Sequence, residues 1–439
     1  MANILKAPRG TMDVLPDKID KWTYIEYTAR ETANLFGFKE IRFPTFESID
    51  LFRRGVGETT DVVQKEMFTF THGNSNFALR PEGTASTVRL VLSNGLYNDP
   101  MPLKLFYITS CFRGERPQAG RLREFHQFGV ELFGTAEPSA DAEIILLAKT
   151  MFNNLGIKGL RLEINSIGCP NCRKDYQNAL REYFTSKQDG LCDTCKSRLG
   201  RNPMRILDCK SPECQKIAEA APKVTDYICD DCRTHFEAVQ NQLKNLNVDF
   251  IVNTSIVRGL DYYTRTVFEF IDEKRGLTLC GGGRYDGLVS QLGGPELPAL
   301  GFAMGLERLI MTMDEQGCSY ETEQNKTVYF ATIGDAASKK AAELALKLRT
   351  EGISAEYDLV GRSMKAQMKY ANRKGFAFTV AIGDNELNSN TAELKNMQTG
   401  ETIPVTLDDK IIEAIDNAIV KETMKELEET IEKDKIFNS

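Results

Sequence analysis

Strand-forming sequence in this chain breaks off near residue 168 and resumes near residue 249. The stretch between is rich in Cys, Lys, Asp and Asn and poor in the β-branched and aromatic residues that strands prefer. Because the sequence on either side has the pattern of short strands and helices, we expect one sheet domain in two pieces, residues 1–167 and 249–318. A mostly helical insertion at residues 168–248 interrupts it.

The insertion contains eight of the chain's eleven cysteines, arranged as four close pairs. The first two pairs are separated by 19 residues, within the range of a four-cysteine zinc site, and eight thiolates could form two tetrahedral sites. In a cytosolic chain a metal is favoured over disulfides, whereas free thiols and redox chemistry are the alternatives. The candidate zinc ligands are Cys169, Cys172, Cys192, Cys195, Cys209, Cys214, Cys229 and Cys232. The isolated Cys111, Cys280 and Cys318 are expected to be packing residues.

The charge of the chain excludes one broad class of function. A formal net charge of -7 rules out a protein that is basic all over and coats nucleic acid, although a local basic surface can still attract phosphate. No apolar run approaches the roughly 20 residues that span a bilayer, and residues 1–9 lack the apolar core of a secretory signal. We therefore expect a cytoplasmic protein of two or three domains with no membrane partner.

The stretch from Arg258 to Asp286 gathers residues suited to an anion. It begins Arg258-Gly-Leu-Asp-Tyr-Tyr263 and ends Cys280-Gly-Gly-Gly-Arg-Tyr285-Asp286, with a strand predicted at residues 264–279 between them. Glycines in a strand let a ligand approach the backbone, and a guanidinium fork donates two parallel hydrogen bonds to a phosphate or carboxylate. The alternative is a hairpin with a surface arginine.

Two strands predicted at residues 104–113 and 123–133 are joined by a long, positively charged loop. Because successive side chains alternate between faces, one face of the second strand is mixed and the other is largely apolar. The mixed face carries Arg123, Phe125, Gln127, Gly129 and Glu131, and the other carries His126, Phe128, Val130 and Leu132. We interpret the mixed face as the floor of a binding site, because an exposed strand face seldom carries a Phe and a Gly. A solvated polar face is the alternative.

Local signals predict further elements. Residues 38–46 are predicted to form a strand near a sheet edge because of Pro44, and residues 139–155 a helix capped by Ser139. Residues 299–315 are predicted to form one helix. Its Gly301 and Gly305 imply close packing against a sheet or ligand, since each glycine costs a helix about 1 kcal/mol.

Residues 327–420 alternate between strand and helix, which predicts a parallel or mixed sheet with helices on both faces. Residues 319–326 are expected to be a linker, and residues 421–439 a charged tail. Lys365, Lys369 and Arg373 are spaced to form a basic stripe on one face of a predicted helix. The alternative is an ordinary solvated helix face.

Five segments of the chain together resemble histidyl-tRNA synthetases. They are Arg80-Pro-Glu-Gly-Thr84, the stretch from Phe112-Arg-Gly-Glu-Arg116 to Arg123-Glu-Phe-His-Gln127, Arg258-Gly-Leu-Asp-Tyr-Tyr263, Cys280-Gly-Gly-Gly-Arg-Tyr285 and Gly301-Phe-Ala-Met-Gly-Leu-Glu-Arg308. The Phe-Arg and Gly-Leu-Glu-Arg segments look like motifs two and three of class II synthetases, and the Pro44 strand looks like motif one, which in that class builds the dimer interface. The resemblance covers nearly the whole chain.

The resemblance implies an α+β fold and a two-step reaction. The fold is an antiparallel sheet with flanking helices, a helical insertion and a C-terminal α/β anticodon-binding domain at residues 327–420. Histidine attacks the α-phosphate of ATP with Mg²⁺ present, and the adenylate is transferred to tRNA(His). The implied partners are L-histidine, ATP, tRNA(His) and a second copy of the chain.

The resemblance also assigns roles to individual residues. Arg113 and Arg258 are implied in catalysis, Arg113, Glu115, Arg123, Phe125 and Arg308 in ATP binding, and Arg116 and Gln118 in contacts with tRNA. Histidine would be bound by Glu82, Gly83, Thr84 and Gln127 around its amino group, by Glu131 and Tyr263 at its imidazole, and by Tyr262 and Tyr285 as walls.

Two other functions are compatible with parts of the sequence. One is a catalytically inactive regulatory subunit of histidine biosynthesis, but such proteins usually lack the anticodon-binding domain and degrade the Arg258 motif, and both are intact here. The other is a zinc-dependent nucleic-acid-binding module, which the intact Arg113, Arg258 and Arg308 argue against. Many members of the family have no cysteines in the insertion, so the zinc prediction rests on spacing alone.

Overall fold

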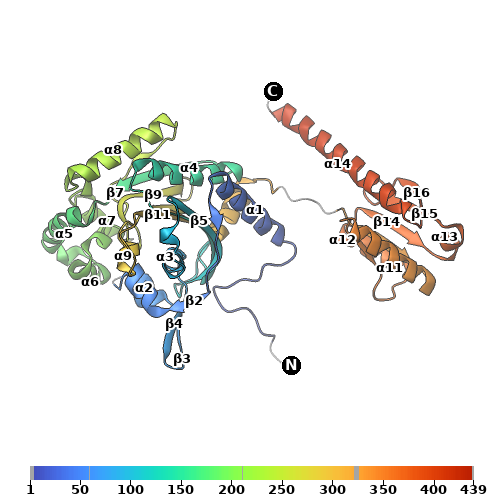
Figure 1. The fold of residues 1–439 in the computed structure, drawn as a ribbon, viewed down its shortest axis with the longest axis horizontal. Helices are drawn as coiled ribbons and strands as arrows, with labels where there is room; N and C mark the ends of the chain where they lie inside the picture. Colours follow the sequence, from blue (N-terminus) through green and yellow to red (C-terminus); the bar gives the residue numbers. More distant parts are fainter. Residues whose placement is uncertain (1–3, 59, 210, 321–325, 438–439) are drawn as a thin grey trace. The chain divides into compact units, whose positions relative to one another are not determined.

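The computed structural model describes residues 4–58, 60–209, 211–320 and 326–437. It divides into two compact units, residues 1–321 and 322–439, each of which has its own sheet (Figure 1). None of the described helices is long and apolar enough to cross a membrane.

The main sheet of the N-terminal unit is mixed. Its described strands follow the order β1-β5-β6-β11-β10-β9-β7-β8. Its centre, from β5 to β7, is antiparallel, and the short edge strands β1 and β8 pair in parallel. The predicted α+β fold is therefore confirmed. The strands are β1 (Lys39–Glu40), β5 (Leu103–Phe112), β6 (Glu124–Phe133), β7 (Leu160–Ser166), β8 (Ile251–Val252), β9 (Thr264–Asp272), β10 (Leu277–Arg284) and β11 (Ala299–Gly305).

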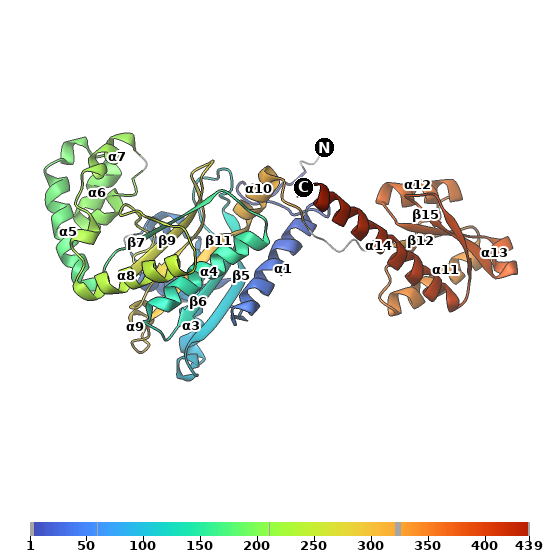
Figure 2. The same cartoon turned by 90° about the horizontal axis from the view of Figure 1, so that it is seen from above.

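Helices α1 (Ile19–Leu35), α4 (Pro138–Asn154), α8 (Asp230–Asn245) and α10 (Leu306–Gln316) cover one face of this sheet (Figures 1 and 2). Their apolar side chains pack with those of the strands, such as Phe128 and Phe268, into one core. Helix α8 belongs to the cysteine-rich stretch of sequence, yet its Val239 and Leu243 are part of this core. The last helix of the insertion thus packs on the sheet.

A second apolar core joins the opposite face of the sheet to the rest of the insertion. Val88 of α3, Leu288 of α9 and Leu180 of α5 are buried in it. A small sheet of order β2-β4-β3 projects as a hairpin beside this core (Figure 1). The elements on this side are α2 (Ile49–Val56), α3 (Thr84–Ser93), α5 (Pro170–Thr185), α6 (Asp193–Arg201), α7 (Pro212–Glu219), α9 (Leu288–Gln291), β2 (Phe46–Ser48), β3 (Thr69–His72) and β4 (Ser75–Leu79). They are joined by the short π-helix η1 (Val62–Glu66) and the short 3-10 helices η2 (Leu96–Asn98), η3 (Gln188–Gly190), η4 (Pro203–Ile206) and η5 (Val224–Asp226).

The prediction of one helix at residues 299–315 is wrong. Residues 299–305 form the strand β11, and α10 begins at Leu306. Strand β11 lies between β6 and β10, and a Cβ atom at Gly301 would stand 2.1 Å from a carboxylate oxygen of Glu131. The glycine therefore marks close packing, as expected, but in a strand.

Three other elements also differ from the sequence prediction. Residues 264–279 form two strands, because a turn at Gly276, whose φ is +64°, separates β9 from β10. Residues 38–46 do not form one strand, since β1 and β2 belong to different sheets on either side of Pro44. Ser139 is not the cap of α4, which begins at Pro138, a residue whose fixed φ suits the first helical position.

The C-terminal unit has a mixed sheet of order β13-β12-β14-β15-β16, as predicted from its alternating pattern. Helices α11 and α14 pack on one face and α12 on the other, which leaves Lys365, Lys369 and Arg373 of α12 exposed. The elements are β12 (Val328–Thr332), β13 (Ala355–Tyr357), β14 (Phe378–Ile382), β15 (Thr391–Asn396), β16 (Thr402–Thr406), α11 (Asp335–Thr350), α12 (Met364–Lys374), α13 (Asp384–Ser389) and α14 (Lys410–Phe437). Helix α14 continues through residue 420 into the predicted tail.

Candidate active site

Glu131 is the centre of a buried polar cluster on the mixed face of β6. Its side chain accepts hydrogen bonds from the hydroxyl groups of Thr84 (2.7 Å), Tyr107 (3.2 Å) and Tyr285. Burial raises the pKa of Glu131 to about 8, against the opposing effect of these donors. The fold thus keeps an acceptor group away from water, held by hydroxyls from α3, from β5 and from the residue that follows β10.

Three glycines make room for this cluster. A Cβ atom at Gly83 or at Gly129 would lie 2.2 Å from the ring of Tyr107, and a Cβ atom at Gly301 would overlap Glu131. No side chain could occupy these positions while Tyr107 and Glu131 keep theirs. Gly129, the glycine on the mixed face of β6, is therefore needed to leave room for the ring of Tyr107.

Glu82 forms the edge of the cluster at the start of α3. Its carboxylate accepts from the backbone N–H groups of Thr84 and Ala85, both at 2.8 Å, where the positive end of the helix dipole favours an anion. Burial raises the pKa of Glu82, and these backbone donors work against that rise. The Tyr262 hydroxyl lies 3.4 Å from the same carboxylate.

Tyrosine rings from the segments 258–263 and 280–285 meet in this cluster. Tyr262 contacts the rings of Tyr263 and Tyr285, with centroids 4.8 Å and 5.6 Å apart. Gln127 lies on the same face of β6 as Glu131, and its side-chain oxygen accepts from the Cys111 thiol at 3.3 Å. All the residues predicted to bind histidine are thus on or beside one patch of the sheet.

Arg258 connects the tyrosine cluster to the glycine run. Its guanidinium lies 5.9 Å from the centroid of the Tyr263 ring, and it occupies the space that a side chain at Gly281 would fill. It forms an ion pair with Glu269, which also accepts from Thr278 at 2.9 Å. Burial works against the charged form of Arg258, but Glu269 outweighs it and raises the pKa.

Further arginines gather next to this site. Arg113 donates to the Pro81 carbonyl at 2.9 Å and stands 5.3 Å from the Phe125 ring centroid. Arg308 donates to the carbonyls of Gly120 (3.2 Å) and Thr278. Burial, together with the nearby positive charge of Arg121 and that of Arg113, lowers the pKa of Arg308 to about 10. A bound anion would relieve this repulsion.

The remaining predicted residues lie in the loop between β5 and β6. Glu115 pairs with Arg121 at 3.1 Å, and its backbone carbonyl accepts from Arg123 at 3.4 Å. Arg116 and Gln118 are exposed at the tip of the loop. The loop therefore presents one basic and one amide side chain to solvent, beside the arginines Arg113 and Arg308.

Two motif residues have structural roles. Arg284 is fully buried and binds Asp141 of α4 at 2.6 Å, so it ties β10 to the helix layer. Glu307 accepts from the backbone and ring nitrogens of His126, at 2.8 and 3.0 Å. In the described part of the chain, neither side chain forms a hydrogen bond or an ion pair with the Glu131 cluster or with Arg258.

Sequence reasoning missed Tyr107 and Glu269, which contact Glu131 and Arg258 directly. Both lie on strands whose neighbouring side chains are core residues, Phe106 beside Tyr107 and Phe268 and Phe270 beside Glu269. The alternation of strand faces, applied to β5 and β9 as it was to β6, would have assigned both residues to the binding face.

The eight insertion cysteines form two groups of four, but not with the predicted partners. Cys169 and Cys172 lie with Cys229 and Cys232, and Cys192 and Cys195 lie with Cys209 and Cys214; within each group all sulfur atoms are within 4.8 Å of one another. The pairing of the first two sequence pairs is wrong, because the fold brings the N-terminal end of α8, rather than that of α6, to the N-terminal end of α5. We call them the first and the second cysteine cluster.

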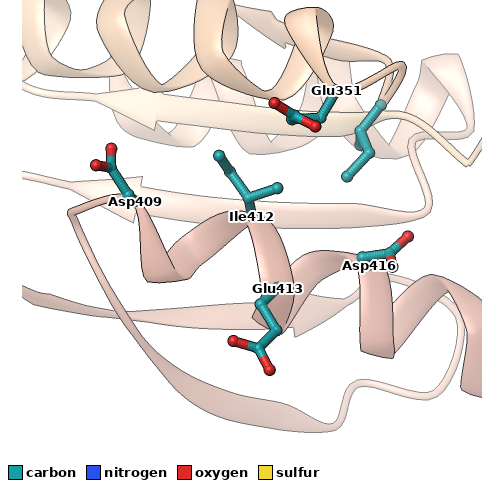
Figure 3. A pocket seen from close by; sticks show the side chains of 6 residues that line it. Glu351, Asp409, Ile412, Glu413 and Asp416 are labelled. Atoms are coloured by element: carbon teal, nitrogen blue, oxygen red, sulfur yellow. The ribbon is translucent and has the colours of Figure 1, made fainter.

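The C-terminal unit has a hollow between the end of α11 and the start of α14 (Figure 3). Acidic side chains line it, and it also contains Ile353 and Ile412. The labelled acidic residues are Glu351, Asp409, Glu413 and Asp416. Its charge would repel a phosphate backbone, so it is a poor candidate for a nucleic-acid contact.

An antiparallel sheet that holds arginines beside a buried polar cluster, followed by a separate α/β unit, has the organisation of a class II aminoacyl-tRNA synthetase. Residues 10–309 match the histidyl-tRNA synthetase family, and residues 327–417 match the anticodon binding domain. The chain belongs to the histidyl-tRNA synthetase family.

Relatives of known function support the same family. The chain is 50% identical over 408 residues to the histidine–tRNA ligase of Acetivibrio thermocellus, covering 92% of this chain and 98% of the relative. It is 52% identical over 398 residues to that of Caldicellulosiruptor saccharolyticus, covering 90% and 95%. The apo histidyl-tRNA synthetase of S. aureus has 38% sequence identity and a TM-score of 0.79, covering 94% of this chain and 99% of that one. These relatives favour the ligase over the regulatory subunit.

Proposed function

We propose that the cluster around Glu131 and Arg258 is the site where this histidine–tRNA ligase activates histidine with ATP. The enzyme is an aminoacyl-tRNA ligase, which couples L-histidine to tRNA(His) in translation at the expense of ATP. The observation that carries the assignment of the site is a buried carboxyl group held by three hydroxyls, next to several arginines. We assign the reaction to the cytoplasm, where translation takes place.

Histidine specificity would come from Glu131. Its carboxylate would accept a hydrogen bond from an imidazole N–H, with Thr84 and Tyr285 orienting it and Tyr263 beside the ring. An apolar side chain in the same place would leave a buried acceptor unpaired, which costs more than a lost contact. The amino group of histidine would be bound by Glu82, Thr84 and Gln127. Gly83 would allow histidine to approach the backbone closely, and Tyr262 would line the site.

Activation would need positioned positive charge more than acid–base chemistry. A carboxylate oxygen of histidine bonds to the α-phosphorus of ATP, the bond to the β-phosphate breaks, and pyrophosphate leaves. Charge builds on the α-phosphoryl oxygens, and Arg258 and Arg113 would stabilise it from two sides. Arg308 would hold the nucleotide, together with Arg123, Glu115 and Phe125.

Mg²⁺ accompanies ATP in this class of enzyme. It prefers oxygen ligands, and the carboxylates of Glu115 and Glu269 lie among the arginines of the site, paired with Arg121 and Arg258. These two residues would therefore hold the ion. When bound, Mg²⁺ neutralises charge on the phosphates.

The tRNA would contact both units. Arg116 and Gln118 at the loop tip would meet the acceptor end, whose terminal hydroxyl attacks the histidyl carbonyl carbon and releases AMP. The exposed Lys365, Lys369 and Arg373 of α12 would lie near the anticodon stem, since basic side chains supply most of the affinity for a phosphate backbone.

We also assign a homodimer and a structural zinc. Phe46, Phe70 and Phe77 form an aromatic group on the small sheet β2-β4-β3, and Phe46 and Phe70 are 48% and 42% exposed. A second copy of the chain would cover this apolar surface.

The two cysteine clusters would hold zinc, which prefers four thiolate ligands in structural sites.

The role of Arg258 is tested by histidine-dependent exchange of pyrophosphate into ATP. We expect Arg258→Lys to lower the exchange rate by about 100-fold or more, because an ammonium cannot reproduce the guanidinium fork. Arg275→Lys is the matched control, since Arg275 pairs with Asp272 at 2.9 Å on the turn between β9 and β10. Exchange by Arg258→Lys at the control's rate would contradict the assignment.

A further inference from the structure

The sulfur atoms of both cysteine clusters have the spacing of a metal site. A tetrahedral zinc with bonds of about 2.3 Å places its sulfurs roughly 3.8 Å apart. Cys172 and Cys232 in the first cluster, and Cys192 and Cys209 in the second, are each 3.8 Å apart. A disulfide needs about 2.05 Å, and all these cysteines are free.

Three of the four sequence pairs share one local design. Cys169, Cys192 and Cys229 each precede a helix, and their partners lie in its first turn, where the helix dipole stabilises negative charge. Backbone N–H groups also donate to sulfur, from Cys229 to Cys172 at 3.1 Å and from Cys192 to Cys214 at 3.3 Å. Such donors stabilise thiolates, which are the form that binds a metal.

The helices that carry the second cluster are short. Helix α6 has 9 residues and α7 has 8, whereas isolated helices of fewer than about 12 residues are marginal in water. A metal that joins their first turns would supply the stability that their length does not.

Each cluster lies beside an arginine that reaches the candidate active site. Arg173 follows Cys172 on α5 and donates to the backbone carbonyls of Asp261 (3.5 Å) and Tyr263. These carbonyls belong to residues 259–263, the segment that follows Arg258 and carries the tyrosines. Cys172 of the first cluster is thus the sequence neighbour of a residue that contacts this segment directly.

The second cluster reaches the same segment through η4, which lies between Cys195 and Cys209. Arg205 of η4 donates to the carbonyl of Gly259 and binds the Asp261 carboxylate at 3.3 Å, with its own side chain 11% exposed. Asn202 donates to the same carboxylate at 3.1 Å. From the other side, the Asp261 backbone N–H donates to Val56 at 3.2 Å. Segment 259–263 is therefore held between α2 and the insertion.

We propose that each cysteine cluster binds one Zn²⁺ and that the two ions fix the arginines that hold segment 259–263. Arg173 and Arg205 are positioning residues: they contact the backbone of the segment, and the segment places Tyr262, Tyr263 and Arg258. The part that concerns catalysis rests on the proposed function, whereas metal content and the order of the segment do not.

Elemental analysis of the full chain, purified without chelator, tests the metal sites. We expect about two zinc per chain, and about one in Cys232→Ser or in Cys195→Ser, because each variant disrupts one cluster. Cys318→Ser, outside both clusters, is the control and should keep two. If the variants do not fold, Co²⁺ loaded into the wild type should give the visible absorption of a tetrahedral tetrathiolate. Less than about 0.2 zinc per chain, with no such absorption, would overturn the proposal.

Hydrogen exchange of the amides in residues 259–263 tests the link to the active site. Arg173→Ala and Arg205→Ala should keep both metals but exchange these amides at least about ten times faster, and the KM for histidine in pyrophosphate exchange should rise about tenfold. Arg181→Ala, whose side chain bonds to Asn178 on its own helix, is the control. Protection equal to the wild type in both variants would overturn the positioning role. Absent pyrophosphate exchange in the wild type, with protection changed as expected, would instead count against the proposed function.

Discussion

Glu131 is a carboxyl group that the fold removes from water and then surrounds with hydroxyl donors. Without histidine, the neutral form is favoured, because burial raises its pKa to about 8. An imidazole N–H would supply a donor that stabilises the ionised form instead. The same burial that would make the site selective therefore makes the unliganded site sensitive to pH.

This pH sensitivity can be measured as stability. The ordinary pKa of this carboxyl group is 4.5 and burial raises it to about 8, so its stabilising contribution is fully present below about pH 4.5 and is lost as the pH rises through about 8. The loss is on the order of 1.4 kcal/mol per pKa unit. We expect Glu131→Gln to lose less unfolding free energy than the wild type between about pH 5 and about pH 9.

Unfolding of the N-terminal unit can be followed through Trp22, the chain's single tryptophan, which is buried in α1. Glu356→Gln, at an exposed position of β13, is the control and should leave the pH dependence unchanged. Equal pH dependence in Glu131→Gln and the wild type would show that this carboxyl group is not perturbed.

At the scale of elements, the site depends on how closely the strands β6, β11 and β10 approach. The sequence pattern predicted β6, its two faces and the polar side chains on one of them, because alternation is a strong signal in a strand with one buried face. It could not predict β11, because glycines at 301 and 305 are weak signals for any regular element. What assigns residues 299–305 to a strand is the partner strand on either side, which is a tertiary effect.

The close approach gives a prediction for β11. Gly301→Ala places a Cβ atom against Glu131 and the Val130 carbonyl, so Glu131 or the strand must shift. We expect a loss of about 1–3 kcal/mol in stability and about 100-fold in histidine-dependent exchange. Gly305→Ala, on the same strand with no atom within 4 Å of its Cβ position, should melt like the wild type. A Gly301→Ala protein with normal stability and exchange would contradict the packing described for Glu131.

At the scale of the whole molecule, the fold class was largely predictable. The alternation of strand and helix predicted the C-terminal α/β unit, which has its own core. The partners within the insertion were not predictable, because cysteine spacing along the chain says nothing about which helix ends meet in the fold. Likewise, Cys172 and Arg173 are neighbours in the sequence, but only the fold brings Arg173 to Tyr263.

The central claim is that the Glu131 cluster selects histidine for activation by ATP. Pyrophosphate exchange with each of the twenty amino acids, with wild type and Glu131→Ala and without tRNA, tests it most directly. We expect exchange with histidine alone in the wild type, and in Glu131→Ala a KM for histidine at least about 100-fold higher with lost selectivity, because the buried acceptor is gone. No exchange with any amino acid in folded protein with Mg²⁺, or an unchanged KM for histidine in Glu131→Ala, would contradict the claim.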